Sequence, residues 1–194
     1  MSKRRKGDLL IFTGLLLVAA ALFLTGYNLL ENRRAQRNVD KVTEKIQEIT
    51  VEVHPEYVIN TDMELPVEEI DGMKYVGVLK MPTLQLELPV LSEWSGNGRK
   101  LSPCRYTGTP YAENMVLAAH NYKAHFQNLR NLKQGDLIIF QDMAGNVFEY
   151  TVDCTEILRP TDVEEMTESP WPLTMFTCTY DVQEHVTVRC SKVQ

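Results

Sequence analysis

Cysteine and histidine are scarce in this chain of 194 residues, which has four of each. The four cysteines are Cys104, Cys154, Cys178 and Cys190. They have neither the close spacing of a zinc site nor the density of a disulfide scaffold. The sequence also contains no internal repeat and no low-complexity tract, which excludes repeat architectures. A thiol is therefore available for chemistry that is neither metal binding nor cross-linking.

Positive charge is in deficit over most of the chain. Residues 1–30 hold four Lys or Arg and one Asp, so the remainder has 16 basic and 25 acidic residues and a formal charge of −9. A surface of that sign repels a phosphate backbone. We therefore expect no nucleic-acid partner.

Charged residues are absent from one long run, residues 9–30, with the sequence LLIFTGLLLVAAALFLTGYNLL. A helix of this length crosses the roughly 30 Å hydrocarbon layer of a bilayer. The alternative is a cleaved secretory signal, whose apolar core has only about 7 to 15 residues. No small-x-small cleavage site follows the run, so we predict an uncleaved transmembrane anchor.

Basic residues flank this run on both sides, with Lys and Arg at positions 3–6 and three arginines at positions 33, 34 and 37. The positive-inside rule then favours an internal N-terminus only mildly. We predict a single-pass protein of the cell membrane with its C-terminal bulk outside the cell. The predicted parts are a cytoplasmic basic tail (1–8), the anchor (9–30), a juxtamembrane helix and linker (31–68) and the main domain (69–194).

Hydrophobic periodicity predicts a helix and then a β domain. Residues 33–49 have an apolar stripe at Val39, Val42, Ile46 and Ile49, with spacings of three and four, as in a stalk or a helix packed on the domain. Further on, turn clusters separate short strand candidates, and MAGN at 143–146 joins two of them as a hairpin. Seven strands at this spacing indicate a sandwich or a closed barrel with short helices at 125–132 and 161–167. The predicted strands are 75–80, 86–91, 116–119, 136–141, 147–158, 173–180 and 185–192.

Two of these strands end in residues whose side chains can take part in catalysis. VLAAHNYKAHF (116–126) places His120 at the end of a buried strand, and LTMFTCTYDVQEHVTVRC (173–190) places Cys178 at the end of another. Each residue alone is ordinarily structural, since free cysteine packs as a small hydrophobe. Together, and each followed by polar turn residues, they favour a cysteine–histidine pair in a shared cleft.

This order of motifs resembles the sortase family, the membrane-anchored cysteine transpeptidases of Gram-positive bacteria. The resemblance rests on AAHN followed by FTCTY and HVTVRC, and it runs from about residue 75 to the C-terminus. It implies an eight-stranded β barrel with Cys178 as the nucleophile and His120 as the catalytic histidine. A papain-like protease is a more distant alternative, because its order of cysteine before histidine and its cysteine at the start of a helix are both missing here.

The implied reaction cuts a sorting peptide of the Leu-Pro-x-Thr-Gly kind and holds the acyl group as a thioester on Cys178. The acyl group then passes to an amine of a cell-wall precursor or a pilin lysine. The resemblance implies no cofactor, and we assign no metal ligand. The alternative is a non-catalytic, membrane-tethered β domain that binds a peptide or a partner protein in the same groove.

The sequence departs from the family at a third position. Sortases have an arginine at the start of the last strand, to hold the substrate and the oxyanion, and His185 occupies that position here. Arg189 follows roughly 13 Å further along an extended strand. Three interpretations stay open: His185 replaces the arginine, Arg189 serves through a shifted register, or the site is impaired.

Overall fold

The computed structural model describes residues 3–49, 60–95, 98–168, 170–179 and 183–193. By its internal contacts the chain divides into an N-terminal unit, residues 1–34, and a barrel unit, residues 35–194. Helix α1 (Lys3–Ile49) contributes residues to both units.

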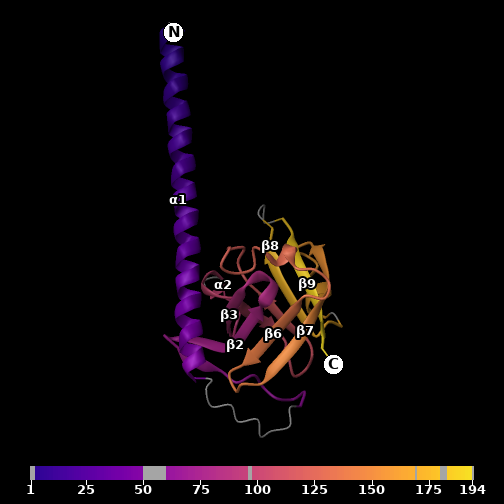
Figure 1. Cartoon of the computed structure of the whole chain (residues 1–194). Helices are drawn as coiled ribbons and strands as arrows, with labels where there is room; N and C mark the ends of the chain where they lie inside the picture. The colour runs from indigo at the N-terminus through magenta and orange to yellow at the C-terminus, as the bar shows by residue number, and fades with distance from the viewer. Residues whose placement is uncertain (1–2, 50–59, 96–97, 169, 180–182, 194) are drawn as a thin grey trace. The chain divides into compact units, whose positions relative to one another are not determined.

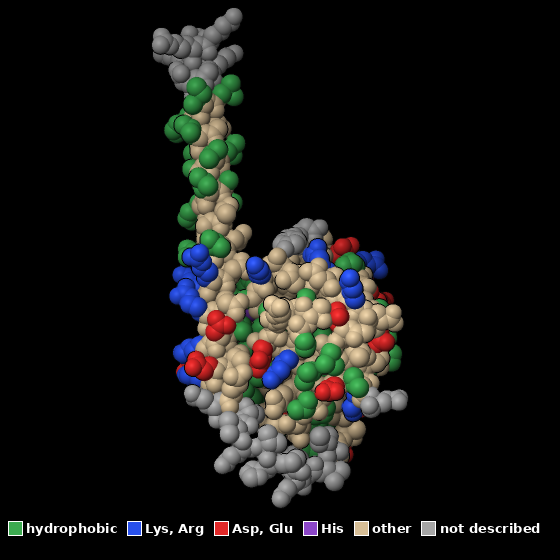
Figure 2. Space-filling view, viewed as in Figure 1, with side chains coloured by type: hydrophobic (Ala, Val, Ile, Leu, Met, Phe, Trp, Pro, Cys, Tyr) green, Lys and Arg blue, Asp and Glu red, His purple; other side chains and the backbone are tan. Residues whose placement is uncertain are grey.

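In the N-terminal unit, α1 contains the apolar run. The large hydrophobic side chains described from Leu10 to Leu30 are all more than half exposed, and Figure 2 shows them along this stretch of the helix. Within the described residues, α1 alone is long and apolar enough to cross a membrane, with a mean hydropathy of 2.2 in its most apolar window. It is therefore the candidate transmembrane span that the sequence predicts.

Short strands, with a few short helical segments between them, make up the barrel unit (Figure 1). The strands are β1 (Glu68–Ile70), β2 (Met73–Met81), β3 (Leu86–Leu91), β4 (Cys104–Thr107), β5 (Met115–Ala118), β6 (Leu137–Asp142), β7 (Val147–Leu158), β8 (Leu173–Cys178) and β9 (His185–Lys192). The helices are η1 (Pro82–Leu84), α2 (Gly98–Leu101), η2 (Leu129–Asn131) and α3 (Val163–Thr167).

Eight of the strands close into a barrel. Their order is β2-β3-β4-β5-β8-β9-β7-β6, and β6 pairs with β2 to complete the circle, while β1 pairs with the first residues of β2. The pairs β3–β4 and β5–β8 are parallel and the other pairs are antiparallel. Closure leaves no unpaired edge in the circle, and the mostly β, eight-stranded barrel is the predicted fold class.

Alternation along β8 and β9 divides their side chains between two faces. Leu173, Met175, Val186 and Val188 point into the barrel core and are 3% exposed or less. Cys178 lies on the opposite face of β8, because successive side chains of a strand alternate. Because one face of β8 and β9 is buried in the core, the residues on the other face, Cys178 among them, point out of the barrel.

The final turns of α1 pack on the barrel. Val39, Val42 and Ile46 are at most 3% exposed and join the clusters of buried hydrophobic residues formed by the strands. Burying side chains of this size stabilises the fold by roughly 1.5–3 kcal/mol each. The packed-helix interpretation is confirmed for these three residues, whereas Ile49, the last member of the predicted stripe, is 48% exposed.

The seven predicted strands are all present, with shifts of one or two residues at some ends; position 180 lies outside the described residues. Two short strands, β1 and β4, and helix α2 were not predicted. The predicted helix over 125–132 is wrong in extent, since only η2 is helical there and turns form the rest. The predicted helix over 161–167 is present as α3. Of the predicted linker, residues 50–59 lie outside the described part.

Candidate active site

The ends of β5 and β8 lie side by side. These parallel strands pair with a constant offset of 58 positions, from Met115↔Leu173 to Ala118↔Phe176. The same offset relates His120 to Cys178, which follow the last pair. The two segments stay in contact beyond that pair, because the backbone N–H of Ala119 donates to the carbonyl oxygen of Phe176 at 3.3 Å and the hydroxyl of Thr177 donates to the carbonyl oxygen of Ala119 at 2.9 Å. With strands about 4.8 Å apart, His120 and Cys178 occupy neighbouring backbone positions.

A backbone contact orients the imidazole of His120. The backbone N–H of Asn121 donates to Nδ1 of His120 at 3.0 Å. Since Nδ1 accepts this bond, the neutral ring carries its proton on Nε2. The ring of Tyr122 lies against it, with ring centroids 4.2 Å apart. This bond fixes the neutral tautomer of the half-buried His120, and forming the imidazolium requires Nδ1 to release the N–H of Asn121.

The loop after His120 is held by its own backbone. The carbonyl oxygen of His120 accepts hydrogen bonds from the N–H groups of Tyr122 at 2.8 Å and Phe126 at 3.5 Å. Phe126 is fully buried in the barrel core. These contacts replace the predicted helix with a compact loop and hold His120 at its position.

His125, the second histidine of this loop, is fully buried. Neither of its ring nitrogens has a hydrogen-bond partner within normal limits. Burial lowers its pKa from 6.5 to about 4, the nearby Leu101 carbonyl opposes that shift, and His120 adds a small lowering. Its ring lies 5.7 Å from that of Tyr122. His125 is therefore a neutral packing residue at physiological pH.

Cys178 and His185 face each other across β8 and β9. The antiparallel register pairs them directly, and the ring of His185 lies 5.2 Å from the ring of Phe176 on the same face as Cys178. Burial lowers the pKa of His185 below 6.5. Cys178 is half-buried.

Arg189 lies elsewhere on the same strand. It pairs with Thr174, four residues before Cys178, which corresponds to roughly 13 Å along an extended strand. Its side chain is 3% exposed and donates from Nε to a carboxylate oxygen of Glu156 at 2.6 Å. The register therefore keeps Arg189 away from Cys178 and places His185 opposite the thiol.

A buried apolar cluster with partly exposed aromatic neighbours adjoins Cys178. Phe176, on the same face, belongs to a small buried cluster separate from the barrel core, and the rings of Trp94 and Tyr106 lie 6.4 and 5.5 Å from its ring. Trp94 and Tyr106 are each more than a third exposed. The other cluster members are Val116, Ala118, Leu158 and Met166. The alternation of β8 places Phe176 on the same face as Cys178, but nothing in the sequence indicated that Trp94 or Tyr106 would join it.

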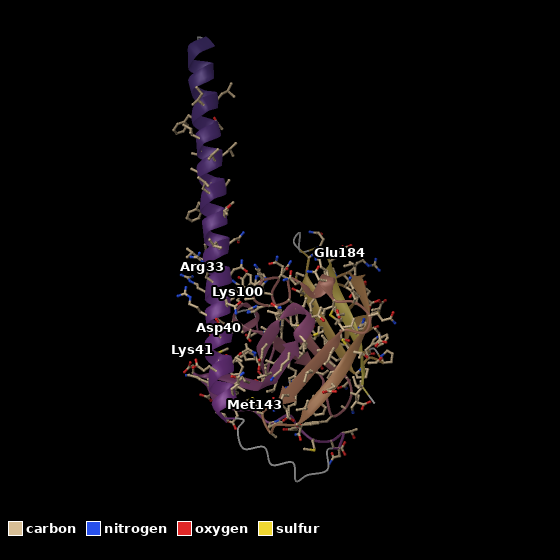
Figure 3. All side chains as sticks on the ribbon, in the orientation of Figure 1. Arg33, Asp40, Lys41, Lys100, Met143 and Glu184 are labelled. Atoms are coloured by element: carbon tan, nitrogen blue, oxygen red, sulfur yellow. The ribbon has the colours of Figure 1, made fainter. Side chains whose placement is uncertain are left out.

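Glu184 lies at the turn into β9 and is labelled in Figure 3. Its carbonyl oxygen accepts hydrogen bonds from the backbone N–H of Thr179 at 2.8 Å and from the hydroxyl of Thr179 at 3.1 Å. These bonds hold the ends of β8 and β9 together directly beyond Cys178.

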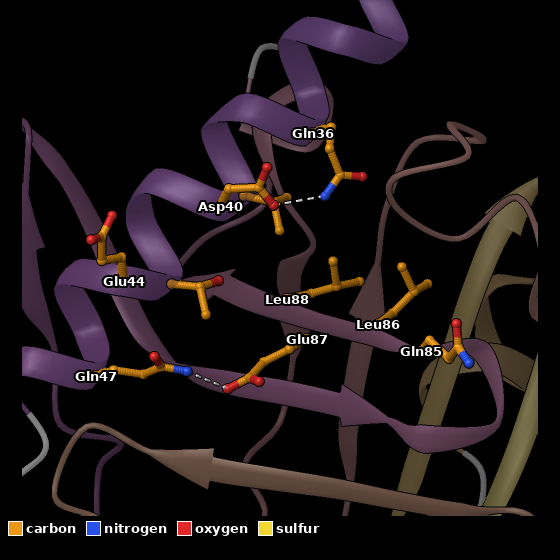
Figure 4. A pocket seen from close by; sticks show the side chains of 10 residues that line it. Gln36, Asp40, Glu44, Gln47, Gln85, Leu86, Glu87 and Leu88 are labelled. Carbon is orange, nitrogen blue, oxygen red and sulfur yellow. Dashed lines mark hydrogen bonds between the residues drawn. The ribbon is translucent and has the colours of Figure 1, made fainter.

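A cavity of about 360 Å³ lies within the barrel unit between the end of α1 and β3 (Figure 4). Two pairs of polar side chains in its walls are bonded to each other: Gln36 donates to Asp40 at 2.8 Å and Gln47 donates to Glu87 at 3.2 Å. None of the residues that line it belongs to β5, β8 or β9. In the described part of the chain, no group of three or more His, Cys, Asp or Glu residues is arranged to hold a metal ion.

The family is established by comparison with known domains. A model of the sortase domain matches residues 79–193. Because this match covers more than half of the chain, the protein belongs to the sortase family. No curated protein matches the chain significantly.

Solved sortase structures share the fold. Sortase C1 from Streptococcus suis is 25% identical over 62% of this chain and 73% of its own length, with a TM-score of 0.55. Sortase C from Clostridium perfringens is 22% identical over 84% and 90%, with a TM-score of 0.54. Sortase A from Corynebacterium diphtheriae is 17% identical over 90% and 96%, with a TM-score of 0.56. The family and the fold together support a transpeptidase of the sortase type.

Proposed function

We propose that this protein is a membrane-anchored cysteine transpeptidase in which Cys178 is the nucleophile and His120 the general acid and base. The observation that carries the proposal is the constant offset between β5 and β8, which brings the two residues to neighbouring strand ends. The substrate is a sorting peptide of the Leu-Pro-x-Thr-Gly kind on a surface protein. The domain acts outside the cell, with α1 as its anchor.

The first half-reaction forms a thioester. The sulfur of Cys178 attacks the carbonyl carbon of the scissile Thr–Gly bond, and the C–N bond breaks. His120, as imidazolium, donates its proton to the leaving amine. The acyl group remains on the sulfur, and the C-terminal peptide departs.

The second half-reaction resolves the thioester with an amine. Its nitrogen attacks the thioester carbonyl, neutral His120 takes the proton, and the C–S bond breaks to return the thiolate. The amine belongs to a cell-wall precursor or to a pilin lysine. Exclusion of water matters at this stage, because the thioester must survive until the amine arrives.

His185 is the proposed residue at the third catalytic position, since it lies opposite Cys178. An imidazole donates to an oxyanion when it carries a proton on the facing nitrogen. It is a weaker donor than a guanidinium, because its charge is lost above its pKa.

The test uses the full chain in detergent, incubated with a small library of Leu-Pro-x-Thr-Gly-like peptides and an amine. Intact-protein mass spectrometry should show an acyl adduct on Cys178 that resolves into an amide. The adduct should be absent in Cys178→Ala, while Cys154→Ala, at an exposed cysteine outside the site, should behave as wild type. Peptide that binds the folded wild-type protein without any adduct would instead support the non-catalytic peptide-binding domain.

A further inference from the structure

Arg189 connects three separate elements from a buried position. Its Nε donates to Glu156 of β7, its Nη1 to the hydroxyl of Thr174 of β8 at 3.0 Å, and its Nη2 to the carbonyl oxygen of Glu165 in α3 at 2.7 Å. Side-chain hydrogen bonds of a buried cation are stronger than neutral ones. The guanidinium on β9 therefore attaches α3 to the sheet formed by β7, β8 and β9.

Helix α3 has little stability of its own. It has five residues, and its N-cap residue Asp162 makes no side-chain capping bond. A helix this short is not stable in isolation and depends on tertiary contacts. The bond from Arg189 to the carbonyl oxygen of Glu165 is such a contact.

The residue after Glu165 is Met166, which is 4% exposed. Met166 belongs to the apolar cluster that contains Phe176, two residues before Cys178 on the same face of β8. Two residues of strand correspond to roughly 6.6 Å, so this cluster reaches the neighbourhood of the thiol. Met166 thus packs in the buried apolar cluster that lies next to the proposed nucleophile.

We propose that Arg189 is a positioning residue that fixes α3 on β8 and β9, and thereby fixes Met166 in the buried apolar cluster that supports a peptide-binding subsite beside Cys178. The subsite receives an apolar side chain of the peptide, and Arg189 acts on selectivity and affinity without contact with the reacting atoms. The role in selectivity rests on the proposed transpeptidase function, whereas the attachment of α3 does not.

Lysine cannot replace the guanidinium in this position. Its single nitrogen cannot reach three acceptors that arginine meets with three different nitrogens. Arg189→Lys keeps a positive charge near Glu156 but loses the arrangement of three nitrogens that reaches three acceptors. Thr174→Val removes only the bond from Nη1. Arg159 provides a matched control, since it is an exposed arginine in the same β7–β8 connection that bonds to Asp162.

The structural arm of the test is hydrogen–deuterium exchange on the full chain in detergent. Arg189→Lys should speed exchange in residues 163–168 by at least about tenfold, given the strength of a charged hydrogen bond. Exchange in β7 should stay unchanged, and Arg159→Lys should match wild type. Thr174→Val should give a smaller increase at the same residues. Unchanged exchange over 163–168 in Arg189→Lys would overturn the proposal, whether or not the wild type cleaves peptides.

The functional arm compares peptides that carry a large or a small apolar residue N-terminal to the scissile bond. Arg189→Lys should raise KM by about tenfold and reduce the preference between the peptides, with kcat within about twofold. Met166→Ala should reproduce the lost preference, and combining the two substitutions should add little. The rate and pH profile of Cys178 alkylation by iodoacetamide should stay as in wild type. A fall in kcat with an altered alkylation profile would overturn the proposal, because it would place Arg189 at the reacting atoms.

Discussion

Cys178 lies directly opposite His185 in the antiparallel pair of β8 and β9, at the end of the barrel where His120 leaves β5. Arg189 lies four residues further along β9, opposite Thr174. The residue that faces the thiol is therefore an imidazole, and the nearest arginine on that strand is bonded elsewhere.

His185→Arg should increase transpeptidation at neutral pH. Burial lowers the pKa of His185, so its ring is largely neutral at pH 7. A guanidinium is charged at every accessible pH and stabilises an oxyanion more strongly. We expect kcat/KM to rise by roughly tenfold, and His185→Ala to lower it by a similar factor. The advantage of arginine should shrink as the pH falls below the lowered pKa of His185, because the histidine then carries its proton.

Lys192→Arg is the control for this series, because it alters a cation on the same strand that pairs with Glu113. Its turnover should equal that of wild type. Full activity of His185→Ala, together with no gain in His185→Arg, would remove His185 from the mechanism.

Thiol reactivity should separate the four cysteines. Cys104 and Cys190 are fully buried, and burial raises the pKa of Cys190, whereas Cys154 is exposed and Cys178 half-buried. Ellman's reagent should therefore titrate Cys178 and Cys154 in the folded protein, and all four thiols after unfolding. Cys178 should react before Cys154, because burial raises the pKa of the Cys154 thiol and so lowers its thiolate fraction. Reaction of Cys104 or Cys190 at the same rate in folded protein would contradict the packing.

His125 should make stability depend on pH. Its pKa is about 4 in the folded protein against 6.5 when unfolded, so the unfolded state binds the proton more tightly. The stabilisation is complete above pH 6.5 and is lost as the pH falls toward 4. Between pH 7 and pH 5 the free energy of unfolding should drop by roughly 2 kcal/mol from this group.

Urea unfolding followed by tryptophan fluorescence measures this loss. The matched variant is His125→Gln, which keeps a polar side chain and cannot titrate. The difference between pH 7 and pH 5 should be smaller in this variant by most of the 2 kcal/mol estimated above. An identical pH dependence of the unfolding free energy in both proteins would show that the ring of His125 is not held in its neutral form by burial.

Gly108 should tolerate no side chain. Its φ is +70°, and an added Cβ would lie 2.0 Å from the carbonyl oxygen of Asn114. Gly135 has a similar φ of +90°, but nothing lies within 4 Å of its added Cβ. Gly135→Ala should cost about 1 kcal/mol from backbone conformation alone, and Gly108→Ala clearly more. Thermal melting of the two variants measures the difference, and equal melting temperatures would contradict the close approach.

The local sequence pattern was sufficient to predict most strands, because alternating hydrophobicity and turn residues are properties of short segments. Strand β7 and the hairpin at 143–146 follow from it directly. Strand β4 was missed, since Cys104–Thr107 is four residues long and has no alternating apolar face of its own. The predicted helix at 125–132 failed because the carbonyl of His120 and the buried Phe126 bend the chain into a loop, and apolar spacing does not record such contacts.

The sequence by itself determined the apolar anchor candidate, the series of strands and the placement of His120 and Cys178 at strand ends, because each depends on residues close together in the chain. It left the residue opposite Cys178 open, since that depends on the register of β9 against β8. Only the tertiary structure decided that His185 faces the thiol and that Arg189 holds α3. The physical reason is that register and burial arise from pairing between segments distant in sequence.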